Sequence, residues 1–153
     1  MNKRFIGIFV IFFVAVLAMG SVSAANHDFD GYFSMDIPKG TTFEKEDMST
    51  NEGGVKMIDV VYMNDDLMVE YSDNPAFSNE SSVYVYQTTF ELVNYDLTQC
   101  YETQDGNVTL LKPKVVDDEH FPMAFVGDGH KIVMVAGKDS DSILKMAKSV
   151  EFE

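Results

Sequence analysis

The sequence has 153 residues and a formal net charge of −14, from 25 Asp and Glu against 11 Lys and Arg. An acidic surface of this kind repels nucleic acids and anionic lipids, so we expect neither as a partner. The single cysteine, Cys100, excludes an internal disulfide and leaves either a buried thiol or one able to pair between chains.

The first 24 residues are typical of a cleavable export signal. Two basic residues precede an uncharged apolar run over 5–19, which is shorter than the roughly 20 residues of a membrane span. Small residues at Val22 and Ala24 place the cleavage after Ala24, and cleavage after Ala25 is a second register. We therefore expect a chain that is secreted or kept in the cell envelope, with no stable membrane span after cleavage.

The part of the chain after the signal predicts one domain. Residues 25–30 are expected to form a short polar leader, and 31–153 a single globular domain. Residues 32–37 alternate between apolar and polar side chains, which predicts a half-buried strand. A brief strand is expected over 41–44 and a polar loop over 46–54.

The middle of the chain predicts a hairpin, a helix and another strand. Val- and Ile-rich residues over 55–63 and alternating residues over 67–71 favour the hairpin, followed by a loop over 72–82. Over 82–97 apolar residues recur at spacings of three and four, although many are β-branched or aromatic. The length of this segment without Gly or Pro decides for a helix. A further strand is expected over 108–112.

The C-terminal part predicts a second hairpin, a short helix and a last strand. Apolar runs over 121–126 and 130–136 flank an Asp-Gly pair, a strong hairpin signal because such turns need positive φ. A helix follows, and Asp139 or Ser140 can cap it by accepting its first N–H groups. Residues 150–152 are expected to close as an edge strand.

The order of these elements predicts an α+β fold. Short connections favour a mainly antiparallel sheet, and the two helices are expected to cover it as an α/β/α sandwich. The opening stretch 31–40, the closing hairpin 131–137, the helix 142–148 and the strand 149–152 resemble the Mog1/PsbP-like group in layout. The resemblance implies a binding or assembly factor without catalytic residues, and it assigns no role to a numbered residue.

Two acidic stretches and two sequons are the candidate sites. The run over 117–120 combines oxygen donors suited to Ca²⁺ with one nitrogen donor that would suit zinc, although the spacing names no further ligand; its members are Asp117, Asp118, Glu119 and His120. A second run over 64–66 is expected to be a solvated turn. Asn79 and Asn107 stand in N-x-Ser/Thr acceptors for N-glycosylation.

The leading functional hypothesis is a non-enzymatic exported domain that binds a partner or assists an assembly at the cell surface or outside. The partner would be an exported or envelope protein, and no cofactor is expected. One rival is an envelope hydrolase or metal-dependent enzyme that uses Asp117, Asp118, His120 and a third group from another strand. A Ca²⁺-stabilised surface protein is the other rival. The oligomeric state stays open.

Overall fold

Antiparallel strands make up most of the described structure. The computed structural model describes residues 23–75, 99–115 and 120–153. Their helices and strands are, in chain order, β1 (Ala24–Phe29), β2 (Phe33–Pro38), β3 (Glu44–Asp47), β4 (Thr50–Glu52), β5 (Val55–Met63), β6 (Leu67–Asp73), β7 (Cys100–Asp105), β8 (Val108–Pro113), β9 (Met123–Asp128), β10 (Lys131–Gly137), α2 (Ser140–Lys148) and β11 (Glu151–Phe152).

The strands form a large and a small sheet. In the large sheet the neighbours follow the order β3-β5-β6-β10-β9-β8-β7, and β4 also pairs with β5. The small sheet has the order β1-β2-β11. Every pairing in both sheets is antiparallel. Within the described residues the large sheet therefore ends in β3 and β4 at one edge and in β7 at the other.

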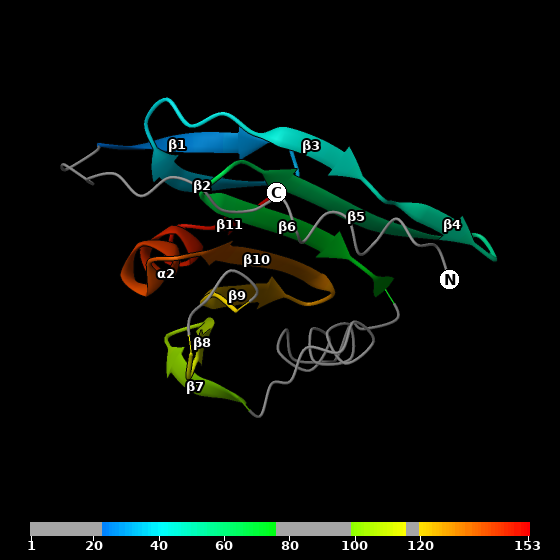
Figure 1. Cartoon of the computed structure of the whole chain (residues 1–153). Coiled ribbons are helices and arrows are strands. Elements are labelled where there is room, and N and C mark those ends of the chain that lie inside the picture. Colours follow the sequence, from blue (N-terminus) through cyan, green and yellow to red (C-terminus); the bar gives the residue numbers. More distant parts are fainter. Residues whose placement is uncertain (1–22, 76–98, 116–119) are drawn as a thin grey trace.

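The small sheet and α2 cover the same face of the large sheet (Figure 1). The helix packs on β8, β9 and β10 and also contacts β2. The small sheet lies beside it, over β5 and β6, where its inward side chains join the same core as those of the large sheet. The β7 edge is the one closer to α2, because β7 pairs with β8 and the helix packs on β8.

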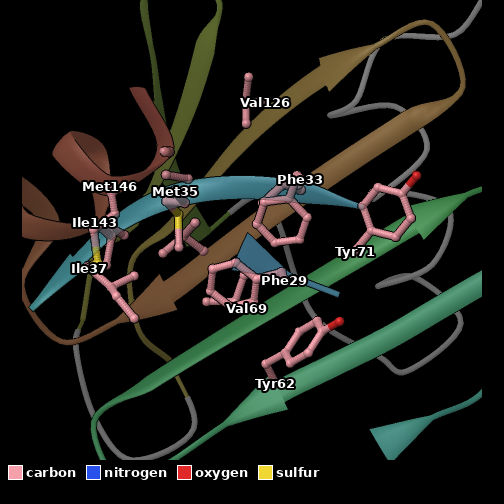
Figure 2. Close-up of a cluster of buried hydrophobic side chains, with 14 of the residues drawn as sticks. Phe29, Phe33, Met35, Ile37, Tyr62, Val69, Tyr71, Val126, Ile143 and Met146 are labelled. Atoms are coloured by element: carbon pink, nitrogen blue, oxygen red, sulfur yellow. The ribbon is translucent and has the colours of Figure 1, made fainter. Parts of the chain in front are cut away.

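The main core lies between these layers and is rich in aromatic rings (Figure 2). Phe33 stacks on Phe29 with 4.5 Å between ring centroids and on Tyr71 with 5.7 Å. Phe29 also meets Tyr62 edge-on at 5.0 Å. Such pairs add about 0.5–1.5 kcal/mol each to the free energy of burial. The alternation predicted over 32–37 is confirmed, because Phe33, Met35 and Ile37 are all buried here.

The opposite face of the large sheet carries a second buried cluster. Its members come from β8, β9, β10 and the residue two positions before β9, and they are Leu111, Phe121, Met123, Phe125, Ile132, Met134 and Ala136. The central strands β9 and β10 are thus buried on both faces. This explains why their sequences are continuous apolar runs and do not alternate.

The expected α/β/α sandwich covered by two helices is wrong. The described residues form an essentially all-β fold, in which α2 is the single helix and is short. The α+β assignment depended on a helix over 82–97, and that segment lies outside the described residues. Among the described residues, no helix has the length and apolar character needed to cross a membrane.

The expected polar leader over 25–30 is wrong as well. Residues 25–29 belong to β1, which pairs along its whole length with β2 and buries Phe29. This segment is a strand because its backbone pairs with β2, although its own sequence is mostly polar. The strand begins at Ala24, the residue before the predicted cleavage point, and the Ser23 carbonyl accepts a hydrogen bond from the Lys39 N–H at 3.0 Å.

The brief strand expected over 41–44 and the loop over 46–54 are replaced by β3 and β4. Both strands pair with β5 and have fully exposed, mainly charged or polar side chains. Between them the Met48 N–H donates to the Asp59 carbonyl at 2.8 Å, and the Asp59 N–H donates to Ser49 Oγ at 3.1 Å. Backbone hydrogen bonds to β5, and not an apolar face, hold these strands in place. Their sequences therefore contain no hydrophobic pattern from which the strands could be predicted.

A polar network ties the β3 edge to the small sheet. Asp30, in the turn between β1 and β2, has a positive φ of 57°. Its Oδ2 lies 2.6 Å from Lys45 Nζ and accepts a hydrogen bond from the Tyr62 hydroxyl at 2.8 Å. The Lys45 hydrogen bond and then the Tyr62 hydrogen bond hold the pKa of Asp30 below its usual value. Burial and then the Asp30 hydrogen bond raise the pKa of Tyr62, so the phenol stays protonated.

The two predicted hairpins and the C-terminal helix are confirmed. The strands β5 and β6 pair from Ile58 to Met63, and β9 pairs with β10. The second turn is shifted by one residue, because Asp128 still pairs with Lys131 and the turn is made by Gly129, at φ 61°, and His130. The N-cap of α2 is Asp139, whose Oδ1 accepts from the Ser142 N–H at 2.7 Å. The last strand, β11, pairs with β2.

Candidate functional site

The β7 edge of the large sheet is exposed along most of its length. Among the described residues only β8 pairs with β7. Residues 101–105 are all exposed, and Tyr101 keeps 62 % of its surface in contact with solvent. Another strand can be added at a sheet edge of this kind through main-chain hydrogen bonds.

The register shows which backbone groups of β7 point outward. The Lys114 N–H donates to the Gln99 carbonyl at 2.8 Å, so this opposed pair is a hydrogen-bonded pair of the ladder. Bonded and non-bonded pairs alternate along an antiparallel ladder. Cys100, opposite Pro113, is therefore in a non-bonded pair, and Glu102 and Gln104 follow with the same orientation. The N–H and C=O groups of Cys100, Glu102 and Gln104 point away from β8.

An aromatic ring and basic side chains border this edge on its helix side. Tyr101 stands opposite Lys112 in the register. Lys114 Nζ lies 5.7 Å from the centroid of the Tyr101 ring, within the range of a cation–π contact. Val115, the next residue, is 69 % exposed. Tyrosine with a flanking cation is a frequent composition of binding surfaces.

The helix adds further lysines to the same border. Lys148 Nζ binds Asp105 Oδ1 at 2.8 Å and so joins the end of α2 to the end of β7. Lys145 lies in the last turn of α2. The positive charges of Lys145 and Lys112 both lower the pKa of Asp139, after the larger effect of the Ser142 hydrogen bonds. We call the exposed set Lys112, Lys114, Lys145 and Lys148 the lysine corner.

The residues singled out by sequence are only partly placed. Asp117, Asp118 and Glu119 lie outside the described residues, as does Asn79. His120 is half-buried just before β9 and engaged by a neighbouring group. Asn107 is exposed in the turn between β7 and β8. In the described part of the chain, no group of three or more His, Cys, Asp or Glu side chains is placed to hold a metal ion.

The structure brings together one Asp–His pair that sequence reasoning missed. His130 Nδ1 contacts Asp73 Oδ1 across the β6–β10 ladder, and the Asn74 N–H donates to the His130 carbonyl at 3.2 Å. Burial and then the charge of Asp73 raise the pKa of Tyr71 to about 12. A hydroxyl with a raised pKa is the opposite of an activated nucleophile. The pair therefore fits a role in fastening the hairpin turn to β6.

A pair of carboxyl groups on β5 and β6 was also missed. Val61 is opposite Glu70 in the register, which makes Asp59 and Glu70 diagonal neighbours on one face. Burial and then the charge of Asp47 raise the pKa of Asp59 to about 6, while a hydrogen bond with Glu70 lowers it. In the part of the chain that the structure describes, Asp59 Oδ1 is buried without a hydrogen-bond partner. Burial of this carboxyl without a full set of hydrogen bonds is expected to lower the free energy of unfolding.

Cys100 lies at the start of β7 and is partly buried. Its side chain packs against the second core cluster, beside residues of β8 and β9. The residue also takes part in a further interaction. Of the two states expected from sequence, the buried one is closer to this partly covered position.

The β7 edge carried no sequence signal that would have found it. Its residues, from Cys100 to Asp105, have no alternating apolar face, and only the register assigns outward backbone groups to three of them. Comparison of the chain with models of known families, with curated proteins and with solved structures finds no match. The resemblance to the Mog1/PsbP-like group therefore stays a prediction.

Proposed function

We propose that this chain is an exported, non-enzymatic domain that binds an extended segment of a partner protein along the β7 edge. The observation that carries the proposal is the outward orientation of the backbone groups of Glu102 and Gln104, two exposed residues of β7. Strand addition at such an edge forms main-chain hydrogen bonds, and neighbouring side chains supply the selectivity. Export follows from the predicted signal over residues 1–24.

The surroundings of the edge support binding more than catalysis. Tyr101 and Lys114 give an accessible aromatic and cationic border, as at many protein interfaces. The one Asp–His pair within the described residues, Asp73 with His130, lies beside a tyrosine whose hydroxyl stays protonated. The hydrolase alternative rests on Asp117 and Asp118, outside the described residues, and no described contact favours it.

Site-specific photocrosslinking in the native host tests this function. A photoreactive benzoylphenylalanine replaces Thr103 on β7 or, as the matched control, Glu46 on the β3 edge; both positions are exposed edge residues. We expect a discrete adduct from position 103 and none from position 46. Chain recovered from the same cells is expected to begin at Ala25.

A second substitution decides whether strand pairing causes the adduct. Glu102→Pro removes an outward N–H while leaving the bonds to β8 in place, and proline is tolerated at such edge positions. The adduct from position 103 is expected to disappear in this background, with the circular dichroism spectrum unchanged. Equal adducts from both edges, or an adduct that survives Glu102→Pro, would show that the proposal is wrong.

A further inference from the structure

Three methionines from three strands surround Ala136 on the face of the large sheet that carries the second buried cluster. Met68 of β6 and Met123 of β9 both stand opposite Ala136 of β10 in the register, one on each side of it. Met134, two residues before Ala136 on β10, belongs to the same cluster as Met123 and Ala136, and Met68 packs against that cluster. The three thioether side chains therefore meet around one small side chain.

The spacing of the sheet brings the three sulfur atoms within reach of one ion. Neighbouring strands lie about 4.8 Å apart, and residues two positions apart on a strand are separated by about 6.6 Å, so each of the three methionines has its Cα about 5–7 Å from that of Ala136. A methionine side chain is unbranched and has three rotatable bonds, so it can bring its sulfur above this position. The single methyl group of Ala136 leaves the room that a longer side chain would fill.

Thioether sulfurs select a particular class of ion. They are soft, uncharged ligands that favour Cu(I), whereas hard cations such as Ca²⁺ prefer oxygen. A thioether has no proton to lose, so its binding of a metal ion does not require the deprotonation on which thiol and imidazole ligands depend. A site of this kind also needs none of the His, Cys, Asp or Glu groupings that are missing from the described residues.

A fourth methionine joins this group to the surface. Met63 of β5 stands opposite Met68, and both side chains are half-buried, whereas Met123 and Met134 are fully buried. Glu70, two residues after Met68 and opposite Met134, places a carboxyl group on the same face. Its negative charge offsets part of the cost of bringing a cation into mainly apolar surroundings.

We propose that Met68, Met123 and Met134 form a three-sulfur site for a soft monovalent cation of the Cu(I) class, with Met63 at its entrance. The three ligands are distant in sequence and come together only through the pairing of β6, β10 and β9. The inference is independent of partner binding at the β7 edge, because none of these residues belongs to β7.

Uptake of Ag⁺, a redox-stable ion of the same class, tests the site. The full domain recovered after export carries Cys100→Ala, which removes its one thiol, and methionines labelled with ¹³C at the methyl group. In chloride-free buffer we expect about one Ag⁺ to bind per chain and to shift the methyl resonances of the three ligands. The resonances of Met35 and Met146, which lie in the other core cluster, should stay in place. Cu(I) supplied anaerobically from its bicinchoninate complex should occupy the same site.

Leucine variants locate the ligands. Met68→Leu with Met134→Leu removes two sulfurs at nearly constant volume, a change that cores tolerate well, and is expected to abolish the uptake. Met68→Leu alone, at a half-buried position, is expected to weaken binding about tenfold and keeps the test decisive if the double variant folds poorly. The matched control, Met48→Leu with Met57→Leu, removes two half-buried methionines elsewhere and should leave uptake unchanged.

The dependence of uptake on pH separates thioethers from other ligands. Binding is expected to be the same at pH 5.5 and 7.5, although histidine gains a proton over this interval. Uptake that is lost at pH 5.5, or that is unchanged in both Met68 variants, would assign the ion to other side chains and overturn the proposal. Absence of uptake by the Cys100→Ala domain would overturn it as well, and would show that the methionines serve packing alone.

Discussion

The two edges of the large sheet are built differently. At the β3 edge the strand carries charged side chains, and Lys45 and Tyr62 fasten it to the small sheet through Asp30. Phe29 and Phe43 pack beneath it. At the β7 edge, β8 is the one described neighbour, and Lys148 binds Asp105 at the end of the strand.

This contrast indicates which of the two edges is open to another chain. Proteins protect sheet edges with charges, bulges or covering segments, because bare edges pair with other chains. Here the β3 edge has charges and a break between β3 and β4, while β7 has a mixed polar sequence and an exposed tyrosine. We therefore expect changes at the β3 edge to affect folding and changes at the β7 edge to affect binding.

Removal of an aromatic ring under the β3 edge should produce the largest effect. Phe29→Ala deletes the ring that contacts Phe33, Tyr62 and Phe43, and it is expected to lower the free energy of unfolding by about 3–5 kcal/mol. The matched change at the other edge, Tyr101→Ala, is expected to alter it by less than about 0.5 kcal/mol. Urea denaturation followed by circular dichroism measures both. Similar losses would erase the distinction between the edges.

The buried carboxyl of Asp59 predicts an effect of opposite sign. Its pKa is about 6 in the folded chain against 3.8 as the ordinary value, so the folded state binds more protons between these pH values. Folding stability from this group is therefore full below about pH 4 and falls as the pH rises through 6. Asp59→Asn is expected to raise the free energy of unfolding at pH 7 by up to about 3 kcal/mol.

Denaturant titrations from pH 4 to 8 check this prediction. The Asp59→Asn variant should show a flatter dependence on pH than the parent chain through the interval near pH 6. Asp36→Asn, an exposed acid on β2, is the control and should leave the slope unchanged. The prediction is wrong if the parent chain gains stability as the pH rises from 5 to 7 and Asp59→Asn does not alter that gain. The raised pKa of Asp59 would then not determine how the free energy of unfolding depends on pH.

Charge removal at the turn that holds the β3 edge should give a smaller effect than either of these changes. Asp30→Asn keeps a side chain that tolerates positive φ but weakens the bonds from Lys45 and Tyr62, so we expect a loss of about 1 kcal/mol. Asp105→Asn, which breaks the ion pair with Lys148 at the other edge, is expected to cost a few tenths of a kcal/mol. Thermal melts at low and high salt measure both losses.

Residues that bury an apolar face were predictable from sequence, and residues held by backbone pairing were not. The alternation of Phe33, Met35 and Ile37 identified β2, and a cap predicted at Asp139 or Ser140 indicated α2, whose N-cap is Asp139. The polar strands β3 and β7 show no such alternation. Because their side chains are exposed, hydrogen bonds to β5 and β8 define them, and these depend on residues distant in sequence.

The candidate site depended on register, which the sequence does not contain. The outward groups of Glu102 follow from the phase of the β7–β8 ladder, and the pairing of Asp59 with Glu70 follows from that of β5 with β6. The shift of one residue in the last hairpin moved His130 from a strand into a turn, where it reaches Asp73. A local pattern specifies that a hairpin forms but leaves the phase to the tertiary contacts.

The position of β2 between β1 and β11 sets the order in which the domain assembles. The Asp36 N–H donates to Ser149 Oγ across 113 positions of sequence, whereas the hairpin of β9 and β10 joins residues that are nearly adjacent. Contacts between distant residues close large loops and slow the folding rate. The hairpins are therefore expected to gain protection first in pulse-labelled exchange, and the small sheet last, once residues 151–152 have emerged from the ribosome or the translocation channel.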